Sequence, residues 1–239
     1  MKFSLVIPCY NEEKNIPLLI RKYRKFLSDK KNELILVNNG SIDQTKKVIR
    51  KISENKKNII GVSIKNNNGF GHGLLKGFEA TRGKYLLYSH ADLEVDPKDI
   101  LKLIKLSDLE NKSNEKIFIK GHRTNKLKNN WSFLDIIFSY GLTIFSTILF
   151  RKLIYDIHAM PVLFNKTLLK CVKYYPKDFS IDLVFYLTAI NKNYKIKRFS
   201  TSFNKNRRKF GQGSSNTIAK KIKGSIEQII SSIKILLFN

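Results

Sequence analysis

The chain has 239 residues, enough for one α/β domain with a short appendage, and its 42% hydrophobic and 11% aromatic content is typical of a globular protein. The formal net charge is +26, but the lysines are scattered and no compact basic helix carries interleaved aromatic residues, which argues against a dedicated nucleic-acid reader. For this charge two interpretations stay open: attraction to anionic lipid, phosphorylated substrate or nucleic acid, or a lysine-rich composition throughout the proteome.

Strand and helix signals alternate over the first 120 residues. Short apolar runs predict strands at residues 3–7, 34–37, 59–64 and 85–89. Helical spacing of apolar residues predicts helices at residues 12–27, 43–52 and 74–80, and near Pro97, a residue favoured in a first helical turn. This alternation predicts a Rossmann-like, mostly parallel sheet covered by helices on both faces.

After Arg123 the alternation weakens. The apolar segment at residues 133–150 is close to spanning length and has Asp135 as its only charge. Because Asp135, Gly141 and several hydroxyl side chains make it a poor bilayer span, we expect a buried or interfacial helix pair there. Further strands are expected at residues 160–164 and 195–199. Further helices are expected at residues 166–172, 181–190 and 217–237, the last one amphipathic.

The cysteines and the first residues bear on location. Cys9 and Cys171 have neither metal-ligand spacing nor a disulfide framework, which favours a reducing compartment. The apolar run after Met1 is too short for the core of a signal peptide. These features predict a cytoplasmic protein.

Unusual polar residues gather where the predicted strands end, at residues 8–12, 38–41, 66–73 and 90–96. Ligands of such sheets bind outside the carboxyl ends of the strands, so we expect the site there. A dinucleotide fingerprint requires its glycines directly after the first strand, whereas here they follow the third, and a phosphate P-loop is absent from the sequence.

Three acidic residues, Asp92, Glu94 and Asp96, alternate on a stretch expected to be extended, so at least two carboxylates can face one side. Mg²⁺ and Mn²⁺ take oxygen ligands and can clamp a diphosphate leaving group when bound in this way. Taken alone, the cluster could equally be a solvated acidic loop before a helix.

The order VIPCYNEEKNI, ELILVNNGSIDQT and NNNGFGHGLLKGFEATRGKYLLYSHADLEVDP resembles the inverting family 2 glycosyltransferases with a GT-A fold. Within them the chain is most similar to the polyprenol-phosphate sugar transferases of the dolichol-phosphate mannose synthase type. The resemblance implies a GT-A domain at residues 1–216, with a nucleotide-sugar-binding half (1–120) and an acceptor half (121–216). An amphipathic helix at residues 217–239 would follow it.

The resemblance implies a nucleotide-sugar site along the strand-end loops. Its members would be Pro8, Tyr10, Glu12, Asn39, Gly40, Ser41, Asn68, Gly71, His90, Ala91 and Asp92. The family's Asp-Asp-Gly-Ser appears here as Asn38-Asn39-Gly40-Ser41, so Asn39 can accept a hydrogen bond from a base but lacks the charge of an acid.

The family's Asp-Ala-Asp appears as His90-Ala91-Asp92. The resemblance therefore implies Asp92, Glu94 and His90 as ligands of Mg²⁺ or Mn²⁺, with direct contact between His90 and phosphate as the alternative role of that ring.

In the acceptor half, KGHRTN resembles the family's Gly-Ser-Arg segment, which makes Arg123 a candidate for binding the acceptor or the sugar phosphate. The basic loop with Arg208, Gly211 and Ser214 resembles the family's Arg-x-x-Gly-x-Ser, stretched by one residue. Arg207 or Arg208 would close over the diphosphate, for which a guanidinium has bidentate geometry. A solvated turn is the alternative for these arginines.

The resemblance implies a single displacement at the anomeric carbon, in which Asp92 with its metal and Arg208 stabilise the departing nucleoside diphosphate. A lipid phosphate acceptor is already anionic and needs no strong base, whereas a sugar hydroxyl requires one. Asp182 and Asp156 are the candidates for that base, although Asp182 could instead cap the following helix.

The leading interpretation is a hexosyltransferase that moves sugar from a GDP- or UDP-linked donor to a polyprenyl phosphate or to a lipid-linked glycan of the cell envelope. The apolar segment, the amphipathic tail and the basic charge predict a peripheral protein on the anionic inner face of the membrane. No specific nucleic acid is expected as a partner, and a second copy of the chain or a membrane protein stays open.

Three alternatives remain. Replacement of the family acids by Asn38, Asn39 and His90 motivates a non-catalytic nucleotide-binding or accessory protein. A nucleotide-sugar pyrophosphorylase has a similar fold, but the glycine-arginine signature expected after its first strand is missing here. A basic nucleic-acid binder comes last.

Overall fold

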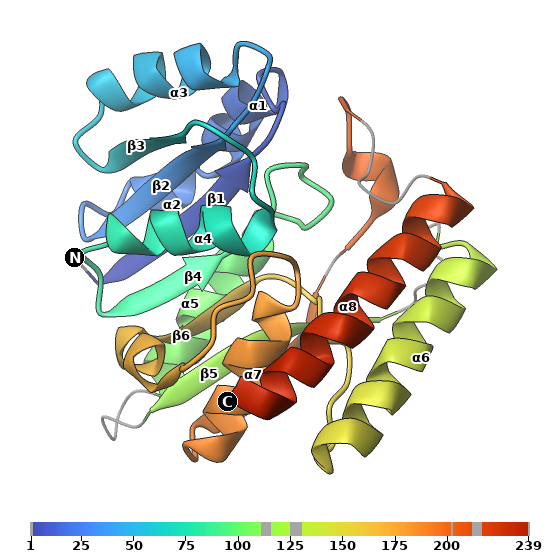
Figure 1. The fold of residues 1–239 in the computed structure, drawn as a ribbon. Helices are drawn as coiled ribbons and strands as arrows, with labels where there is room; N and C mark the ends of the chain where they lie inside the picture. The colour runs from blue at the N-terminus through green and yellow to red at the C-terminus, as the bar shows by residue number, and fades with distance from the viewer. Residues whose placement is uncertain (1, 111–115, 125–130, 202, 212–216, 239) are drawn as a thin grey trace.

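The computed structural model describes residues 2–110, 116–124, 131–201, 203–211 and 217–238. A seven-stranded sheet runs through the molecule in the order β3-β2-β1-β4-β6-β5-β7 (Figure 1). Its strands are β1 (Phe3–Cys9), β2 (Asn32–Asn39), β3 (Ile59–Ile64), β4 (Tyr85–Tyr88), β5 (Ile117–Arg123), β6 (Val162–Asn165) and β7 (Lys195–Thr201). All neighbouring pairs are parallel except those of β6, which runs antiparallel to β4 and β5. The predicted mostly parallel α/β fold is thereby confirmed.

Helices surround this sheet. They are α1 (Asn15–Lys22), α2 (Arg24–Leu27), α3 (Thr45–Glu54), α4 (Phe70–Glu79), α5 (Lys98–Glu110), α6 (Phe133–Phe150), α7 (Ile181–Asn191) and α8 (Ile218–Phe238), with 3₁₀ turns η3 (Lys166–Cys171) and η4 (Lys205–Arg207). The predicted helix over residues 12–27 is divided at Tyr23, and the predicted helix at 166–172 is the 3₁₀ turn η3. Strand β5 was not among the predicted elements.

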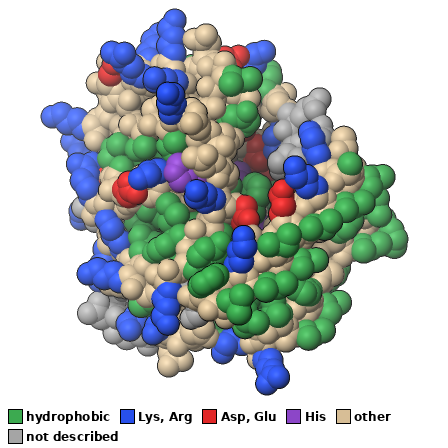
Figure 2. All heavy atoms as spheres, viewed as in Figure 1, with side chains coloured by type: hydrophobic (Ala, Val, Ile, Leu, Met, Phe, Trp, Pro, Cys, Tyr) green, Lys and Arg blue, Asp and Glu red, His purple; other side chains and the backbone are tan. Residues whose placement is uncertain are grey.

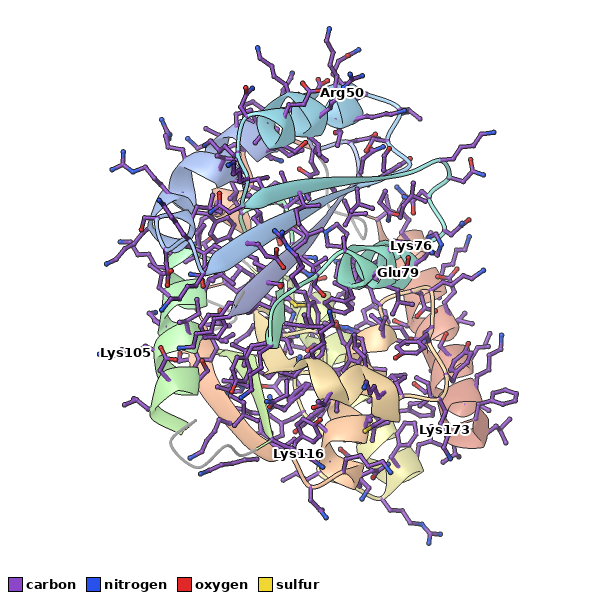
Figure 3. The ribbon with its side chains drawn as sticks, turned by 90° about the vertical axis from the view of Figure 1, so that its left-hand side faces the viewer. Arg50, Lys76, Glu79, Lys105, Lys116 and Lys173 are labelled. Atoms are coloured by element: carbon purple, nitrogen blue, oxygen red, sulfur yellow. The ribbon has the colours of Figure 1, made fainter. Side chains whose placement is uncertain are left out.

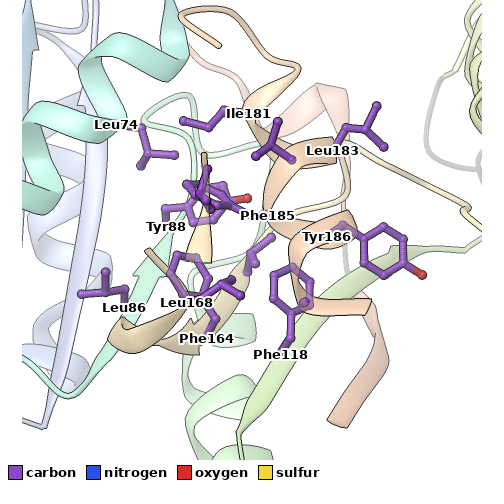
Figure 4. Packing of buried hydrophobic residues seen from close by; sticks show 14 of the residues in the cluster. Leu74, Leu86, Tyr88, Phe118, Phe164, Leu168, Ile181, Leu183, Phe185 and Tyr186 are labelled. Atoms are coloured by element: carbon purple, nitrogen blue, oxygen red, sulfur yellow. The ribbon is translucent and has the colours of Figure 1, made fainter. Parts of the chain in front are cut away.

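Both faces of the sheet are buried, so the central strands are apolar on both sides, as expected for parallel strands between helix layers. On one face β1 contributes Val6 to a core with α4 and α7; on the other, Leu5 and Ile7 pack with α1 and α5. Figure 4 shows the first core, where Tyr88 of β4 and Phe185 of α7 lie among aliphatic side chains.

Residues 133–150 form the single helix α6 where a helix pair was expected, and this helix is exposed, so the buried alternative is wrong, while the interfacial one stays a prediction. Helix α6 is one continuous helix of 18 residues, and only 6% of it is buried. Gly141 does not interrupt the helix, and Asp135 forms a capping box with Ser132 at the N-terminus, which satisfies the first backbone N–H groups. Among the described residues, α6 is the helix with the length and composition to cross a membrane, at a mean hydropathy of 1.8.

Helix α8 lies beside α6, and Lys221 of α8 pairs with Asp135 of α6 at 2.8 Å. Ser231, Ser232 and Ile235 face the domain. The outer sides of the two helices form what we call the α6–α8 face, a band of exposed apolar side chains (Figure 2). Its members include Ile137, Tyr140, Ile144, Ile148, Ile222, Ile226, Ile229, Ile230, Ile233 and Leu237.

Basic side chains are spread over several sides of the molecule. Arg50 on α3, Lys105 on α5 and Lys116 before β5 lie at its periphery in different directions (Figure 3). Some are paired locally, as Lys76 is with Glu79 at 2.9 Å on α4. This distribution agrees with the scattered lysines of the sequence.

Candidate active site

The loops after β1, β2 and β3 meet at the carboxyl edge of the sheet, as the sequence predicts. The Asn11 N–H donates to Ser41 Oγ at 3.1 Å, and the Glu12 N–H donates to Thr45 Oγ1 at 2.8 Å. Gly40 has φ of +71°, and a Cβ there would lie 2.3 Å from the backbone nitrogen of Asn67, so only glycine fits this contact. The predicted donor-binding loops are therefore brought together.

Glu12 lies partly buried at the centre of these loops. Burial raises the pKa of its carboxyl from 4.5 to about 7, although a hydrogen bond from Asn15 Nδ2 at 2.5 Å opposes the shift. Pro8 is buried in β1 beside it, whereas Tyr10 is exposed.

The two asparagines that replace the family's acids have different tasks. Asn38 supports the turn, since its Nδ2 donates to Ser63 Oγ and its Oδ1 accepts from the Ser41 N–H. Asn39 Nδ2 donates to the Gly69 carbonyl at 3.1 Å, while its Oδ1 is buried and has no partner among the described residues. A buried acceptor without a partner is costly, so Asn39 is suited to accept an N–H from a ligand.

The glycine-rich segment packs against two other parts of the site. A Cβ at Gly73 would lie 2.8 Å from Asn39 Cγ, and one at Gly71 would lie 2.3 Å from the Pro176 carbonyl oxygen. Asn68, which was predicted to bind the nucleotide, is exposed. The start of α4 thus joins the β2 loop to the loop before α7.

Arg208 binds two acids that follow β4. Its Nη2 donates to Asp92 Oδ2 at 2.6 Å and its Nε to Glu94 Oε1 at 2.8 Å, while Arg207 pairs with Asp96 at 3.5 Å. Asp92 and Glu94 face one side, as predicted, but the stretch between them is not extended as expected, because Leu93 has a φ of +64°. Acidic side chains lie in and around a hollow beside α8 (Figure 2).

The predicted trio of metal ligands is not assembled. Among the described residues no three His, Cys, Asp or Glu side chains are grouped to hold a metal ion. The reason is that the His90 ring packs against Phe70 and Phe179, with centroids 5.1 and 6.1 Å away. Burial lowers the pKa of this ring, which favours its neutral form. Asp92 and Glu94 alone converge on one point, which the Arg208 guanidinium fills, and such a pair of carboxylates fits a hard divalent cation.

Asp182 lies in the first turn of α7 and is 1% exposed. It accepts hydrogen bonds from Tyr88 Oη at 2.8 Å and from His158 Nδ1 at 3.0 Å. Burial by itself raises the pKa of this carboxyl, but His158, Lys120 and Tyr88 outweigh burial and hold it below its usual value. Asp182 does not cap α7, since no side-chain cap is formed there.

Asp156 is also engaged. Its Oδ2 accepts from the Arg123 N–H at 2.6 Å, and its Oδ1 accepts from Arg123 Nε at 2.7 Å. The guanidinium stacks over Trp131 at 4.7 Å. Arg123 and Asp156, predicted for separate roles, therefore form one pair at the end of β5. Ser214, also predicted for phosphate, lies outside the described residues.

Sequence reasoning missed the residues around His158. Lys120 is fully buried, its Nζ donates to the carbonyls of Ile157 and Ala159, and burial lowers its pKa to about 7. Gln228 of α8 contacts His158 Nε2 at 2.8 Å. The available signal was a lysine at an inward position of an apolar strand.

Comparison with known proteins places this geometry in a family. The family model described as Glycosyl transferase family 2 matches residues 4–173, which is most of the chain. The chain belongs to glycosyl transferase family 2. The matched range includes the donor loops, Asp92 and His158, and ends before α7 and the Arg208 loop.

Two curated relatives are identical to this family 2 chain at about a third of the aligned positions. An undecaprenyl-phosphate 4-deoxy-4-formamido-L-arabinose transferase of Photorhabdus laumondii is 33% identical over 110 residues, which is 45% of this chain and 34% of that protein. A dolichyl-phosphate beta-glucosyltransferase of Dictyostelium discoideum is 30% identical over 178 residues, or 68% of this chain and 54% of that protein. The chain thus spans about a third to a half of the length of these relatives.

Solved structures share the fold. Glucosyl-3-phosphoglycerate synthase from Mycobacterium tuberculosis, in complex with Mn²⁺, uridine diphosphate and glucosyl-3-phosphoglycerate, superposes with a TM-score of 0.65 at 15% identity, covering 100% of this chain and 81% of that one. TarS of S. aureus superposes with a TM-score of 0.55 at 20% identity, covering 84% of this chain and 58% of that one. At these identities the likeness shows the GT-A fold alone.

Proposed function

We propose that this protein transfers a hexosyl group from a nucleotide sugar to a polyprenyl phosphate or to a lipid-linked glycan, by a single displacement with inversion. The observation that carries the proposal is the convergence of Asp92, Glu94 and Arg208 at the carboxyl edge of the sheet, where ligands bind. At the same edge, Asn39 ends β2 with a buried Oδ1 that has no hydrogen-bond partner among the described residues. The names of the two curated relatives, both polyprenol-phosphate sugar transferases, support the acceptor class.

Asn39 would accept a base N–H, and both guanine and uracil offer one, so a GDP- or UDP-linked donor is proposed. Asp92 and Glu94 would hold Mg²⁺ or Mn²⁺, which supplies positive charge for the leaving diphosphate. The M. tuberculosis enzyme was crystallised with Mn²⁺ and uridine diphosphate, which supports this assignment. Arg208, released from the two acids, would then pair with the diphosphate, for which its planar guanidinium is suited.

The α6–α8 face motivates a membrane-bound acceptor. Exposed apolar bands of this extent mark interaction surfaces, and Lys220, Lys223 and Lys234 on α8 suit anionic lipid headgroups. We therefore propose peripheral binding to the inner face of the membrane. Arg123, at the end of β5, would face the acceptor phosphate or the sugar phosphate.

The test is transfer of radiolabelled sugar from a panel of GDP- and UDP-sugars to polyprenyl phosphate in vesicles with Mn²⁺. We expect a labelled lipid product that disappears with EDTA and with Asp92→Asn, since loss of one carboxylate removes a metal ligand and leaves Arg208 bound to Glu94. Asp108→Asn is the matched control, because Asp108 pairs only with Lys2 among the contacts described on the surface. No product across the donor and acceptor panels would reject the proposal.

A non-catalytic nucleotide-binding role is the second candidate, favoured by the salt bridges through which Arg208 fills the space between the two acids. Calorimetry with uridine and guanosine diphosphates separates the two roles. Metal-dependent binding with transfer supports the enzyme, whereas binding that is unchanged by Mn²⁺ and by Asp92→Asn, without transfer, supports the accessory role.

A further inference from the structure

The carboxylate that the sequence suggests as a base does not reach solvent. Asp182 is 1% exposed, and its two oxygens are occupied by Tyr88 Oη and His158 Nδ1. A general base must come within hydrogen-bond reach of the proton that it removes. His158, which is hydrogen-bonded to Asp182, does reach the surface, since 23% of its side chain is exposed.

His158 is held from three directions. Asp182 of α7 accepts from Nδ1, and Lys120 of β5 donates to the carbonyls on either side of it, at Ile157 and Ala159. The ring also packs edge-on against Phe179, with centroids 6.3 Å apart. A residue fixed in this way loses little freedom when it binds a substrate, which favours a positioned catalytic group over a mobile surface histidine.

The hydrogen bonds define the state of the ring. Asp182 is ionised and can only accept, so Nδ1 carries a hydrogen. Nε2 lies 2.8 Å from the side-chain amide nitrogen of Gln228, which can only donate, so in this contact Nε2 accepts through a lone pair. The accepting nitrogen is therefore in contact with a flexible side chain of α8.

His158 is also near the proposed donor site. Phe179 contacts both the His158 ring and the His90 ring, the latter at 6.1 Å, and His90 is two residues from Asp92. On its other side is α8, whose outer residues belong to the α6–α8 face. Nε2 thus faces α8, the helix whose outer side belongs to the proposed membrane-binding face.

We propose that His158 is the catalytic residue that takes the proton of the acceptor during transfer, with Asp182 as its positioning residue and Gln228 as the group that the acceptor displaces. This inference rests on the proposed function. The acceptor oxygen bonds to the anomeric carbon, the bond from that carbon to the diphosphate breaks with its electrons on the leaving nucleoside diphosphate, and the acceptor proton passes to Nε2.

Whether the attacking oxygen of the acceptor carries a proton depends on the chemical class of the acceptor. A hydroxyl always carries it, whereas a phosphate monoester carries it only below its second pKa of about 6. The titratable groups on the elements around the ring are the same in the wild type and in His158→Gln, so a comparison of these two chains isolates the ring. They are Asp182, Tyr88, Lys120, His90, Asp156 and Asp178.

The test compares the full chain with His158→Gln at pH 5.5 and 8.5, using polyprenyl phosphate and a lipid-linked glycan in vesicles. With a hydroxyl acceptor, kcat falls by about 100-fold at both pH values, the usual share of general-base catalysis. With a phosphate acceptor, the loss is at most about fourfold at pH 5.5, because about a quarter of the monoester is already dianionic there, and it disappears at pH 8.5. The donor KM stays near the wild-type value in both cases, and melting temperature confirms folding.

Asp182→Asn and the double variant test the pairing. If the two residues act as one unit, the double variant is no slower than His158→Gln, because members of a catalytic unit are not additive. Tyr88→Phe is the matched control. It removes the other hydrogen bond to Asp182, and we expect kcat to fall by at most about fivefold.

Two outcomes overturn the inference while the proposed function stands. One is a His158→Gln variant that is as fast as the wild type at both pH values with every acceptor that the wild type uses. The other is an Asp182→Asn loss that persists undiminished in the His158→Gln background. A wild-type chain without transfer rejects the proposed function itself.

Discussion

Arg208 shows what a single side chain does in this site and why its partners escape sequence reasoning. It binds Asp92 and Glu94, which lie 116 and 114 residues away along the chain. The family motifs predicted all three residues for the diphosphate site, and that assignment stays a prediction. The position of the arginine between the two acids is a tertiary feature. It arises because residues 203–208 run alongside residues 92–96, where the Asn204 N–H donates to the Glu94 carbonyl at 2.8 Å.

Glu12 gives a prediction at the residue scale. The pKa of this carboxyl is raised to about 7 in the folded chain, whereas its ordinary value is 4.5. Between these two pH values the carboxyl is ionised in the unfolded chain but still protonated in the folded one, so the free energy of unfolding falls as pH rises through this window. The carboxyl is partly exposed, so solvent screening limits the loss to about 1–2 kcal/mol. Glu12→Gln should therefore raise the free energy of unfolding by that amount at pH 8 and leave it unchanged at pH 4.

Urea unfolding at the two pH values measures this effect. Glu79→Gln is the control, since Glu79 is exposed on α4 and pairs with Lys76. An equal gain for both variants at pH 8, or a gain for Glu12→Gln at pH 4, would contradict a buried carboxyl.

At the scale of elements, helix α4 is held against the sheet by small residues. A Cβ at Gly77 would lie 2.3 Å from Val6 Cγ1 of β1, whereas a Cβ at Gly141 of α6 meets nothing within 4 Å. We predict that Gly77→Ala lowers the free energy of unfolding by about 1–3 kcal/mol through overpacking. Gly141→Ala should raise it by about 0.5–1 kcal/mol, because alanine is the better helix former. Urea denaturation measures both, and equal signs would argue against this packing.

The α6–α8 face leads to a prediction about binding to lipid vesicles. Ile226 and Ile230 are about half exposed on α8, and burying each side chain in lipid is worth about 1.5–3 kcal/mol. Replacing both by Asp should weaken partitioning into vesicles by at least about 100-fold. Vesicle flotation measures the effect, with Ile42→Asp as the control, since Ile42 is an exposed isoleucine in the loop between β2 and α3. Unchanged flotation of the double variant would assign this face to another partner.

Helices also show where sequence patterns are ambiguous. Residues 133–150 have few charges, and the sequence alone led to a buried or interfacial helix pair. Asp135 was counted as an interruption, but it caps the helix, and Gly141 continues it. A sequence pattern reports apolarity; whether an apolar helix is covered depends on which elements lie beside it.

At the scale of the whole molecule, the net charge of +26 adds a long-range electrostatic attraction to membranes that contain anionic lipid. Attraction between a basic protein and anionic lipid is screened within about 10 Å at 0.1 M salt. We predict that binding to vesicles with anionic lipid weakens about tenfold or more between 50 and 500 mM NaCl, while the weaker binding to neutral vesicles changes little. Flotation at both salt concentrations checks this, and salt-independent binding to both would leave the apolar face as the only contribution.

The sequence by itself determined the fold class, the order of most elements and the edge of the sheet that carries the donor loops. It could do so because strand and helix periodicities are local, and because parallel strands bring their carboxyl ends to one edge. The boundaries of a GT-A domain at residues 1–216 and of a separate C-terminal helix stay a prediction. Only the tertiary structure decided which acids are paired with Arg208, that His90 packs between aromatic rings, and that Asp182 is covered by His158. These contacts join segments that are far apart in the chain. Local sequence patterns predict helices and strands, but they do not specify which polar side chains of distant segments will meet.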